Sequence, residues 1–278
     1  MYPLRFSIIT PNYNSGRFLE QTLRSVIDQT ERGIDIEYIL IDGGSTDNSQ
    51  EIIRQYAQKI SHTIIEPDTG PANAINKGLR LATGDVLAWL NADDFYYPGT
   101  LNRVRQALTC RPDAALCFGK CPIIDEQGRE IRPGITRFKE SLYPFSSRFT
   151  YQCINYLSQP ALFFRRQAVE QAGLLPEKMI AGWDYDFILR LWHYGDAVQV
   201  AGPPLSAFRW HEGSISGRNF YIQFQEEYLA AKADAGTFSL QTFAHFLVRW
   251  GIVGVYAVMA AMRKKTSNSK AGALCVSE

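Results

Sequence analysis

Two adjacent carboxylates follow an apolar stretch about a third of the way along the chain, in the segment Leu90-Asn91-Ala92-Asp93-Asp94. Carboxylate and amide oxygens are hard ligands that suit Mg²⁺ or Mn²⁺. In proteins such ions take one or two carboxylates and complete their coordination with substrate phosphates. The pattern therefore indicates a divalent-metal site at these acids, with capping of the following turn as their alternative role.

A second pair of acids opens a helical pattern later in the chain. On a helix, Asp184 shares a face with Ile188 and Leu191, four and seven residues on, which points its side chain inward. Asp186 instead precedes Arg190 by four residues, a spacing typical of an exposed ion pair. Asp184 is therefore a candidate general base, with a helix cap as its alternative role.

A single histidine, His211, follows the segment Phe208-Arg209-Trp210. A lone histidine is more often a packing or surface residue than a ligand, so His211 by itself does not predict a metal site.

The elements that must position these residues alternate between strand and helix. Strands are expected at residues 6–9, 36–41, 62–65 and 85–90, and helices at 18–27, 47–60 and 72–82. Ser45 or Thr46 is expected to cap the helix over 47–60. Such alternation predicts an α/β fold with a mostly parallel sheet and helices on both faces.

Polar residues follow three of the expected strands. They are Thr10-Pro11, Asp42 and the stretch from Asn91 to Asp94. In sheets of this kind, ligands bind at the carboxyl ends of the strands. We therefore expect these residues to share one site.

The second half of the chain is less regular. We expect a helix over 101–108, a strand over 114–118, an apolar run over 161–164 and a helix over 166–172. Residues 120–160, rich in Pro and Gly, are expected to form an irregular lid or an insertion that faces the acceptor.

Composition excludes some classes of protein. The 278 residues are 46% hydrophobic and 21% charged, which excludes a wholly disordered chain. The net charge of +1 argues against nucleic acid as the main partner. The five cysteines have no metal-ligand spacing, so free thiols in a reducing compartment are expected. The N-terminal apolar run is short for a signal peptide, so we expect a cytoplasmic location.

The C-terminal part carries an uncharged stretch at 250–262, followed by the basic residues 263–265. A membrane-spanning helix needs about 20 apolar residues. A helix over 236–265 that lies in the membrane interface through 243–265 fits this length better than a spanning one, and a buried core helix is the alternative. Residues 266–278 are expected to be disordered.

Six segments in this order resemble the family 2 glycosyltransferases of GT-A fold, over roughly residues 4–220. They are TPNYN (10–14), IDGGSTDNS (41–49), DTGPANAINKGLRLATGDVLAWLNADD (68–94), QPALFFRRQAVEQAGLLPE (159–177), the segment around Asp184 and the segment around His211. The resemblance implies one GT-A domain over 1–235, in which residues 1–97 bind a nucleotide-sugar and 98–235 bind the acceptor.

The resemblance also implies roles for single residues. The nucleotide-sugar contacts would be Thr10, Pro11, Tyr13, Asp42, Asn91, Ala92 and Asp93. The metal, Mn²⁺ or Mg²⁺, would be held by Asp93, with Asp94 and His211 beside it. Asp184 matches the acid that acts as base in inverting members of the family.

The chain departs from the family pattern at three positions. Asn91 replaces the first acid of the Asp-x-Asp motif, Trp183 stands where Glu is usual, and Gly43 stands where many relatives carry a second Asp for the uracil ring. The last departure leaves the donor nucleotide open. A Gln-x-x-Arg-Trp motif of processive synthases is not found, which favours transfer of a single sugar.

The function expected from the resemblance is inverting, metal-dependent transfer to a hydroxyl of a glycan or lipid-linked acceptor. Bacterial surface-glycan assembly at the inner face of the cell membrane is the expected setting. One alternative is a nucleotidyltransferase of similar fold, although the chain shows no Gly-rich basic loop near its N-terminus. A non-catalytic sugar-nucleotide-binding protein is the other alternative, which Asn91 suggests and the retained Asp93 and Asp184 oppose.

Overall fold

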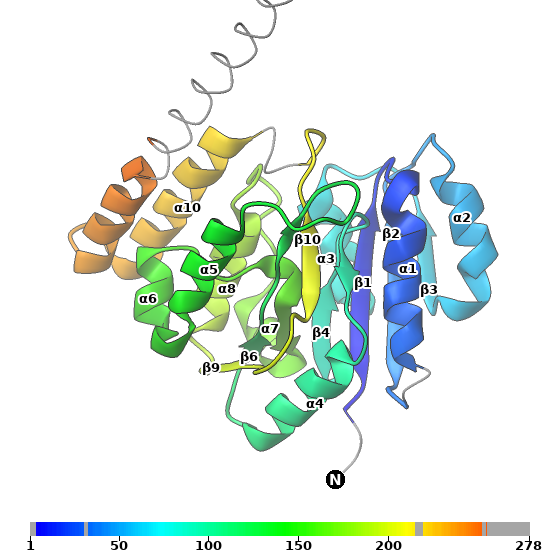
Figure 1. The fold of residues 1–278 in the computed structure, drawn as a ribbon, viewed down its shortest axis with the longest axis horizontal. Helices are drawn as coiled ribbons and strands as arrows, with labels where there is room; N and C mark the ends of the chain where they lie inside the picture. Colours follow the sequence, from blue (N-terminus) through cyan, green and yellow to red (C-terminus); the bar gives the residue numbers. More distant parts are fainter. Residues whose placement is uncertain (1–3, 31–32, 215–218, 252–253, 255–278) are drawn as a thin grey trace, which may run out of the picture.

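The computed structural model of the protein describes residues 4–30, 33–214, 219–251 and 254 (Figure 1). Its centre is a seven-stranded sheet in the order β3-β2-β1-β4-β8-β6-β9. The strands are β1 (Phe6–Asn12), β2 (Ile36–Asp42), β3 (His62–Ile65), β4 (Val86–Trp89), β6 (Leu116–Phe118), β8 (Leu162–Arg165) and β9 (Ala197–Gln199). Strands β3, β2, β1 and β4 are mutually parallel, while β8 runs antiparallel to both of its neighbours. The predicted α/β fold with a mostly parallel sheet is confirmed.

Helices cover the sheet on both sides, so its central strands β1, β2, β4, β6 and β8 are buried on both faces. They are α1 (Gly16–Thr30), α2 (Ser49–Tyr56), α3 (Pro71–Leu81), α4 (Thr100–Cys110), α5 (Pro133–Ser141), α6 (Arg148–Cys153), α7 (Arg166–Ala172), α8 (Trp183–Leu191) and α10 (Phe220–Ala235). Figure 1 shows the elements of the first half gathered around β1 to β3, and α5, α6, α8 and α10 gathered on the opposite side of the molecule.

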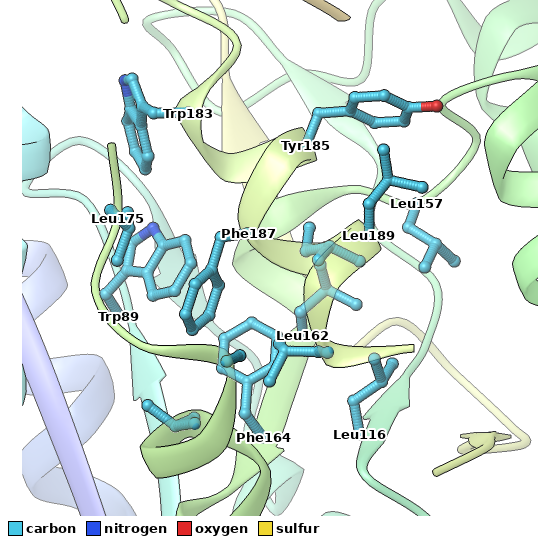
Figure 2. Packing of buried hydrophobic residues seen from close by; sticks show 14 of the residues in the cluster. Trp89, Leu116, Leu157, Leu162, Phe164, Leu175, Trp183, Tyr185, Phe187 and Leu189 are labelled. Atoms are coloured by element: carbon cyan, nitrogen blue, oxygen red, sulfur yellow. The ribbon is translucent and has the colours of Figure 1, made fainter. Parts of the chain in front are cut away.

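The helices bury two separate apolar clusters against the sheet. One joins β1, β2 and β4 to α1, α2 and α4, and the other joins the sheet to α3, α7, α8 and α10. In the second cluster, the Trp89 ring lies 5.2 Å from that of Phe164 and 5.7 Å from that of Phe187, measured between ring centroids (Figure 2). This packing fixes α8, the helix that carries Asp184, against the end of β4.

A second, three-stranded sheet connects distant parts of the chain. Strand β10 (Ser206–Arg209) pairs antiparallel with β5 (Phe95–Tyr96) and parallel with β7 (Ile123–Ile124). Because β5 directly follows Asp94, this pairing brings the segment around His211 to the acids at the end of β4.

Two local predictions at the carboxyl ends of the strands are wrong. Strand β1 continues to Asn12 instead of ending at Ile9, because β2 pairs with it along this whole length. Neither Ser45 nor Thr46 caps α2, which begins at Ser49. The Ser45 hydroxyl instead donates to Asp42 at 2.7 Å, and the Thr46 backbone N–H donates to the Asn14 side chain at 2.8 Å. The loop is thus held by contacts to the end of β2 and to the residues that follow β1.

The stretch 120–160 is more regular than expected. It contains β7, α5, α6 and a 3₁₀ turn at Tyr143–Phe145, and a second 3₁₀ turn, Gln159–Ala161, begins at its end. The Tyr143 ring is buried against Phe118, and its hydroxyl donates to the Gly119 carbonyl at 3.0 Å. The expectation of an irregular segment is therefore wrong for these parts of it.

Residues 240–251 are helical. His245 is buried on one side of this helix, where its Nδ1 lies 2.9 Å from the Gln152 carbonyl oxygen. Phe243, Leu247 and Trp250 are exposed on another side. Across the described residues, the helices are all too short or too polar to span a bilayer. The last part of the predicted interfacial helix, with the basic residues 263–265, and the tail from 266 onward, predicted to be disordered, lie outside the described residues.

Within the described part of the chain, the cysteines Cys110, Cys117, Cys121 and Cys153 are free thiols, as expected.

Candidate active site

The candidate residues from three segments of the sequence meet at one edge of the sheet. Strand β1 pairs in parallel with β2 on one side and β4 on the other, with Asn12 level with Asp42. The carboxyl ends of the three strands therefore lie together, as the sequence predicts.

A buried carboxylate, that of Asp42, holds the backbone at this edge of the sheet in place. Asp42 accepts hydrogen bonds from the Asn12 amide at 2.6 Å, from the Ser45 hydroxyl at 2.7 Å and from the backbone N–H groups of Gly44 and Ser45 at 3.1 and 2.8 Å. Both oxygens of Asp42 thus have internal partners, and its side chain holds the loop after β2. A direct contact between Asp42 and a nucleotide stays a prediction.

Thr10 and Pro11 are also buried in this edge. The Thr10 hydroxyl lies 3.0 Å from the Tyr38 hydroxyl, and both side chains are inaccessible. Like Asp42, they shape the base of the site from inside the sheet.

At this edge of the sheet an exposed aromatic ring, Tyr13, lies near the carboxylate of Asp68. Tyr13 is 64% exposed. A Cβ atom added to Gly43 would lie 2.5 Å from Asp68 Oδ2 and 3.3 Å from Tyr13 Cδ2. Asp68 therefore fills the space in which a side chain at position 43 would sit. Its other oxygen accepts from the Gly70 N–H at 2.9 Å.

Sequence reasoning missed the role of Asp68 in this arrangement. Asp68 opens the family-like stretch 68–94, but its contact with position 43 joins two different loops. The sequence contains one sign of this role. Gly43 lacks the acid that many relatives carry at this position, so a carboxylate with the same function would have to come from another segment.

Asp93 and His211 form the second part of the site. Asp93 Oδ2 lies 3.0 Å from His211 Nε2, and their side chains are 21% and 20% exposed. The antiparallel pairing of β5 and β10 produces this contact, since it aligns the residues before β5 with those after β10.

Asp94 has hydrogen-bond partners of its own, Asn91 and Arg209. It is buried, its Oδ1 accepts from the Arg209 backbone N–H at 2.8 Å, and Asn91 donates to its Oδ2 at 3.3 Å. Burial and the nearby charge of Asp93 raise the pKa of Asp94 well above its usual value. That Asp94 binds a metal stays a prediction; in this arrangement Asp94 anchors β10 to the end of β4.

Sequence reasoning also missed Arg209. Its buried guanidinium donates to the carbonyl oxygens of Asp93 at 2.8 Å and Asp125 at 3.0 Å, and to the Gln21 side chain at 2.6 Å. It also lies 4.6 Å from the Phe18 ring centroid. Arg209 thus fixes the backbone on which Asp93 stands.

The residues fit a divalent ion that substrate helps to bind. Among the described residues there is no group of three or more His, Cys, Asp or Glu side chains that could hold a metal. Two ligands at ~2.1 Å from an octahedral ion, at right angles to each other, lie about 3.0 Å apart. Asp93 Oδ2 and His211 Nε2 have this separation, and carboxylate and imidazole are both ligands of Mn²⁺. Phosphate oxygens would complete such a site.

Asp184 lies in the first turn of α8. Ile188 and Leu191 are buried beneath it, which agrees with the predicted phase of the helix. Burial raises the pKa of Asp184 from 3.8 to about 6, against the hydrogen bond from the Tyr185 N–H and the charge of Lys139. Asp186 pairs with Arg190 at 3.0 Å, and both side chains are partly exposed. The predicted ion pair of Asp186 with Arg190 is confirmed, and the role of Asp184 as a base stays a prediction.

A second buried carboxylate lies near Asp184. Glu227 on α10 accepts from the side chains of Asn155 and Gln223, both at 3.0 Å. Burial raises the pKa of Glu227 to about 7, with a further contribution from the charge of Asp184. Sequence reasoning missed Glu227, because a Glu within a helix gives no sign that it is buried.

Comparison with protein families places residues 7–173 within the family model described as glycosyl transferase family 2. Among curated proteins, an uncharacterized glycosyltransferase of Nostoc sp. is 38% identical over 36% of this chain and 32% of its own length. Uncharacterized glycosyltransferases of Rickettsia conorii and Rickettsia prowazekii are 27% and 25% identical over 79% and 94% of this chain. They are matched over 37% and 86% of their own lengths. The chain thus spans between about a third and two fifths of the length of the first curated relatives that it matches.

Solved structures share the fold. The mannosyltransferase PcManGT from Pyrobaculum calidifontis, in complex with GDP-Man and Mn²⁺, matches 95% of this chain and 76% of its own with a TM-score of 0.66 at 20% identity. S. aureus TarS 1–349, in complex with UDP-GlcNAc, matches 82% of this chain and 66% of its own with a TM-score of 0.64 at 19% identity. At these identities the likeness concerns the fold.

Proposed function

The chain belongs to glycosyl transferase family 2, and from this premise we propose that it transfers one sugar from a nucleotide-sugar to a hydroxyl acceptor, with inversion at the anomeric carbon. The observation that carries the proposal is the Asp93–His211 pair at the carboxyl ends of β1, β2 and β4. The pair joins Asp93, which lies near the end of the family-like stretch 68–94, to a histidine 118 residues away. It lies at the edge where α/β sheets bind ligands.

Tyr13 and Asp68 are proposed to receive the nucleobase. An exposed aromatic ring offers a surface for stacking a planar base, and a carboxylate accepts hydrogen bonds from ring N–H groups. Uracil and guanine both carry such N–H groups. Asp68 would therefore supply the carboxylate that Gly43 lacks, and the donor would be a UDP- or GDP-sugar, the two kinds named in the complexes of similar fold. Thr10, Pro11 and Asp42 would shape this pocket from beneath, and Asn91 and Ala92 its boundary toward the sugar.

Asp93 and His211 are proposed to hold a divalent ion, Mn²⁺ or Mg²⁺, which when bound offsets the charge that grows on the leaving diphosphate. Asp94 and Arg209 would serve the same purpose indirectly, since together they fix the backbone of Asp93 against β10.

Asp184 is proposed to remove the proton from the acceptor hydroxyl. A pKa of about 6 leaves Asp184 mostly ionised at neutral pH and makes it a stronger base than an ordinary carboxylate. Attack by the deprotonated oxygen on the face opposite the leaving diphosphate inverts the anomeric carbon. The residues before 98 would thus bind the donor and those from 98 to 235 the acceptor.

The helix over 240–251 is proposed to contact a membrane surface. Phe243, Leu247 and Trp250 lie three or four residues apart, so they form one apolar stripe, and each is more than half exposed. His245 packs against the protein on another side. The basic residues 263–265 follow in the sequence and suit anionic lipids. A lipid-linked acceptor at the inner face of the cell membrane would lie at such a surface.

A panel of nucleotide-sugars tests the proposal. The protein is incubated with each donor, Mn²⁺ and a mixture of hydroxyl acceptors, and free nucleoside diphosphate is measured. We expect one donor to be consumed. Binding without consumption of any donor would indicate a non-catalytic binding protein. In a second incubation with nucleoside triphosphates and sugar phosphates, release of pyrophosphate would indicate a nucleotidyltransferase.

A further inference from the structure

A carboxylate from the C-terminal part of the chain binds the backbone that leads into Asp184. Glu226 on α10 accepts hydrogen bonds from the N–H groups of Ile180, Ala181 and Gly182, each at 2.8 Å. These three N–H groups are successive and immediately precede α8. The Glu226 carboxylate thus accepts a hydrogen bond from the backbone N–H of each of the three residues 180–182.

The approach of α10 to this segment is unusually close. A Cβ atom on Gly182 would lie 2.7 Å from Glu226 Cβ and 3.3 Å from the Glu227 backbone nitrogen. Gly182 is therefore required where the two elements meet, because any larger residue would push α10 away. The contact is a specific fit between the two backbones.

The contact fixes the position of Asp184. Gly182 is the residue before the first turn of α8, and Asp184 follows it by two residues. A general base must lie within about 2.6–3.2 Å of the proton that it removes. A displacement of about 1 Å in an active site can cost ~100-fold in rate. Holding residues 180–182 in one conformation therefore bears directly on the work of Asp184.

We propose that Glu226 is a positioning residue for Asp184: by binding the N–H groups of residues 180–182, it sets the location of the base relative to the acceptor. This inference rests on the proposed role of Asp184. Glu226 lies outside residues 7–173, the part matched by the family model.

Three other titratable groups interact with Asp184 and affect its titration: Lys139, Glu227 and the buried Tyr151, whose pKa the charge of Asp184 helps to raise. Lys139 from α5 lowers the pKa of Asp184, and Asp184 in turn raises that of Glu227 on α10. None of these groups contributes to the hydrogen bonds on residues 180–182. Glu227 moves with α10 when Glu226 is replaced, and the Asp234 variant controls for that movement.

The chain offers a matched control on the same helix. Asp234 binds the Arg148 guanidinium at 3.1 Å, the Gln152 amide at 2.7 Å and His193 Nε2 at 2.6 Å. Asp234 therefore docks the C-terminal end of α10 on the protein through several hydrogen bonds, as Glu226 does in the first half of the helix. Asp234 has no hydrogen bond to residues 180–182 among those that hold it in place. Loss of either acid loosens α10, whereas only loss of Glu226 frees the segment before Asp184.

The experiment compares Glu226→Ala, Glu226→Gln and Asp234→Asn in the full chain. Hydrogen exchange of the amides at 180–182 is measured, and the Asp184 carboxyl is titrated by ¹³C NMR; neither readout needs a substrate. In Glu226→Ala we expect exchange at these amides at least ~10-fold faster. We also expect the Asp184 titration to move from about 6 toward 3.8, because water reaches the loosened turn.

Activity is measured with UDP-N-acetylglucosamine or GDP-mannose, whichever the wild type consumes. Glu226→Ala should lower kcat by about 10–100-fold with little change in the donor KM. The acid limb of its pH profile should follow the shift in the Asp184 titration. Glu226→Gln keeps one acceptor oxygen and should recover part of the loss. Asp234→Asn should change neither exchange at 180–182 nor the acid limb.

The inference is overturned if Glu226→Ala leaves both the exchange and the Asp184 titration unchanged. It is also overturned if Asp234→Asn reproduces the effects, because Glu226 would then only dock α10. If Glu226→Ala does not fold, Glu226→Gln decides the question by the same measurements. Full transfer by Asp184→Asn would instead overturn the proposed base, and a dead Asp184→Asn beside an unaffected Glu226→Ala would overturn this inference alone.

Discussion

Replacing Asp184 by Asn should make the protein less active and more stable. The folded protein holds the pKa of Asp184 at about 6, against 3.8 for an ordinary Asp. The ionised carboxylate is therefore disfavoured in the fold, and its cost at pH 7 is at most about 3 kcal/mol, at ~1.4 kcal/mol for each pH unit. Asn removes the charge and with it this cost, while it keeps the shape of the side chain.

The sign of the pH dependence follows from the raised pKa. Between pH 6 and 3.8 the folded protein binds more protons at Asp184 than the unfolded chain does, so this group contributes increasing stability as the pH falls through that range. The advantage of Asp184→Asn over the wild type should be largest above pH 6 and vanish near pH 4. Thermal unfolding at pH 7 should show a melting temperature several degrees higher in the variant.

Transfer by Asp184→Asn should fall by about 10²–10⁴-fold, the usual share of general-base catalysis. Donor binding should persist, since the proposed nucleotide contacts lie in the first third of the chain. Asp186→Asn is the control. It removes an ion pair with Arg190 worth only ~0.2–0.5 kcal/mol, and Arg190 still donates to the carbonyl oxygens of Ala172 and Leu174.

The assay measures three quantities in both variants: unfolding, donor affinity and the rate of nucleoside diphosphate release in the presence of acceptor. We expect Asp184→Asn to be stabilised and inactive, and Asp186→Asn to be slightly destabilised and active. An inactive Asp186→Asn beside an active Asp184→Asn would refute the assignment of the base. A destabilised Asp184→Asn would refute the burial argument.

Four further predictions concern pH, metal, base recognition and the membrane. The rate of transfer should fall about tenfold from pH 7 to pH 5, because a carboxyl with a pKa of about 6 is ~90% ionised at the first pH and ~10% at the second; a flat profile over this range would contradict the role of Asp184. Asp93→Ala should abolish turnover and weaken diphosphate binding, and excess EDTA should inactivate the wild type; full activity in either case would refute the metal assignment. Asp68→Ala should raise the donor KM by about 10-fold or more, the loss of one hydrogen bond to a charged acceptor, and an unchanged KM would remove Asp68 from the nucleobase site. Replacing Phe243, Leu247 and Trp250 together by Ser should reduce sedimentation with anionic vesicles, and a wild type that stays in the supernatant at low salt would refute the membrane contact.

Local sequence patterns predicted those parts of the fold that depend on local chemistry. The apolar runs located β1 to β4, and the i, i+4 and i+7 spacing after Asp184 gave the correct phase of α8. The convergence of Thr10-Pro11, Asp42 and the residues after β4 followed from the rule that parallel strands end at the same edge.

Contacts between distant segments could not be predicted in this way. Ser45 looked like a helix cap, but the carboxylate of Asp42 and the amide of Asn12 compete for its hydroxyl more effectively than a helix N-terminus. Asp93 and Asp94 are chemically alike in the sequence, and only the position of β10 makes one accessible and the other buried.

The acids of α10 show the same limit. Glu226 and Glu227 are adjacent, yet one binds the backbone before α8 and the other is buried between Asn155 and Gln223. A helix with polar residues on many sides gives no pattern from which these partners could be derived. They follow from how α10 docks on α8, which involves residues more than 40 positions apart.

The structure of the reaction product tests the central claim most directly. With the donor that the protein consumes, an acceptor alcohol and Mn²⁺, the product is examined by mass spectrometry and by ¹H NMR of the anomeric proton. We predict one added sugar per acceptor, with the anomeric configuration opposite to that of the donor, and one nucleoside diphosphate released for each sugar transferred. Retention of the donor configuration, or nucleoside diphosphate release that never yields a glycosylated acceptor, would contradict it.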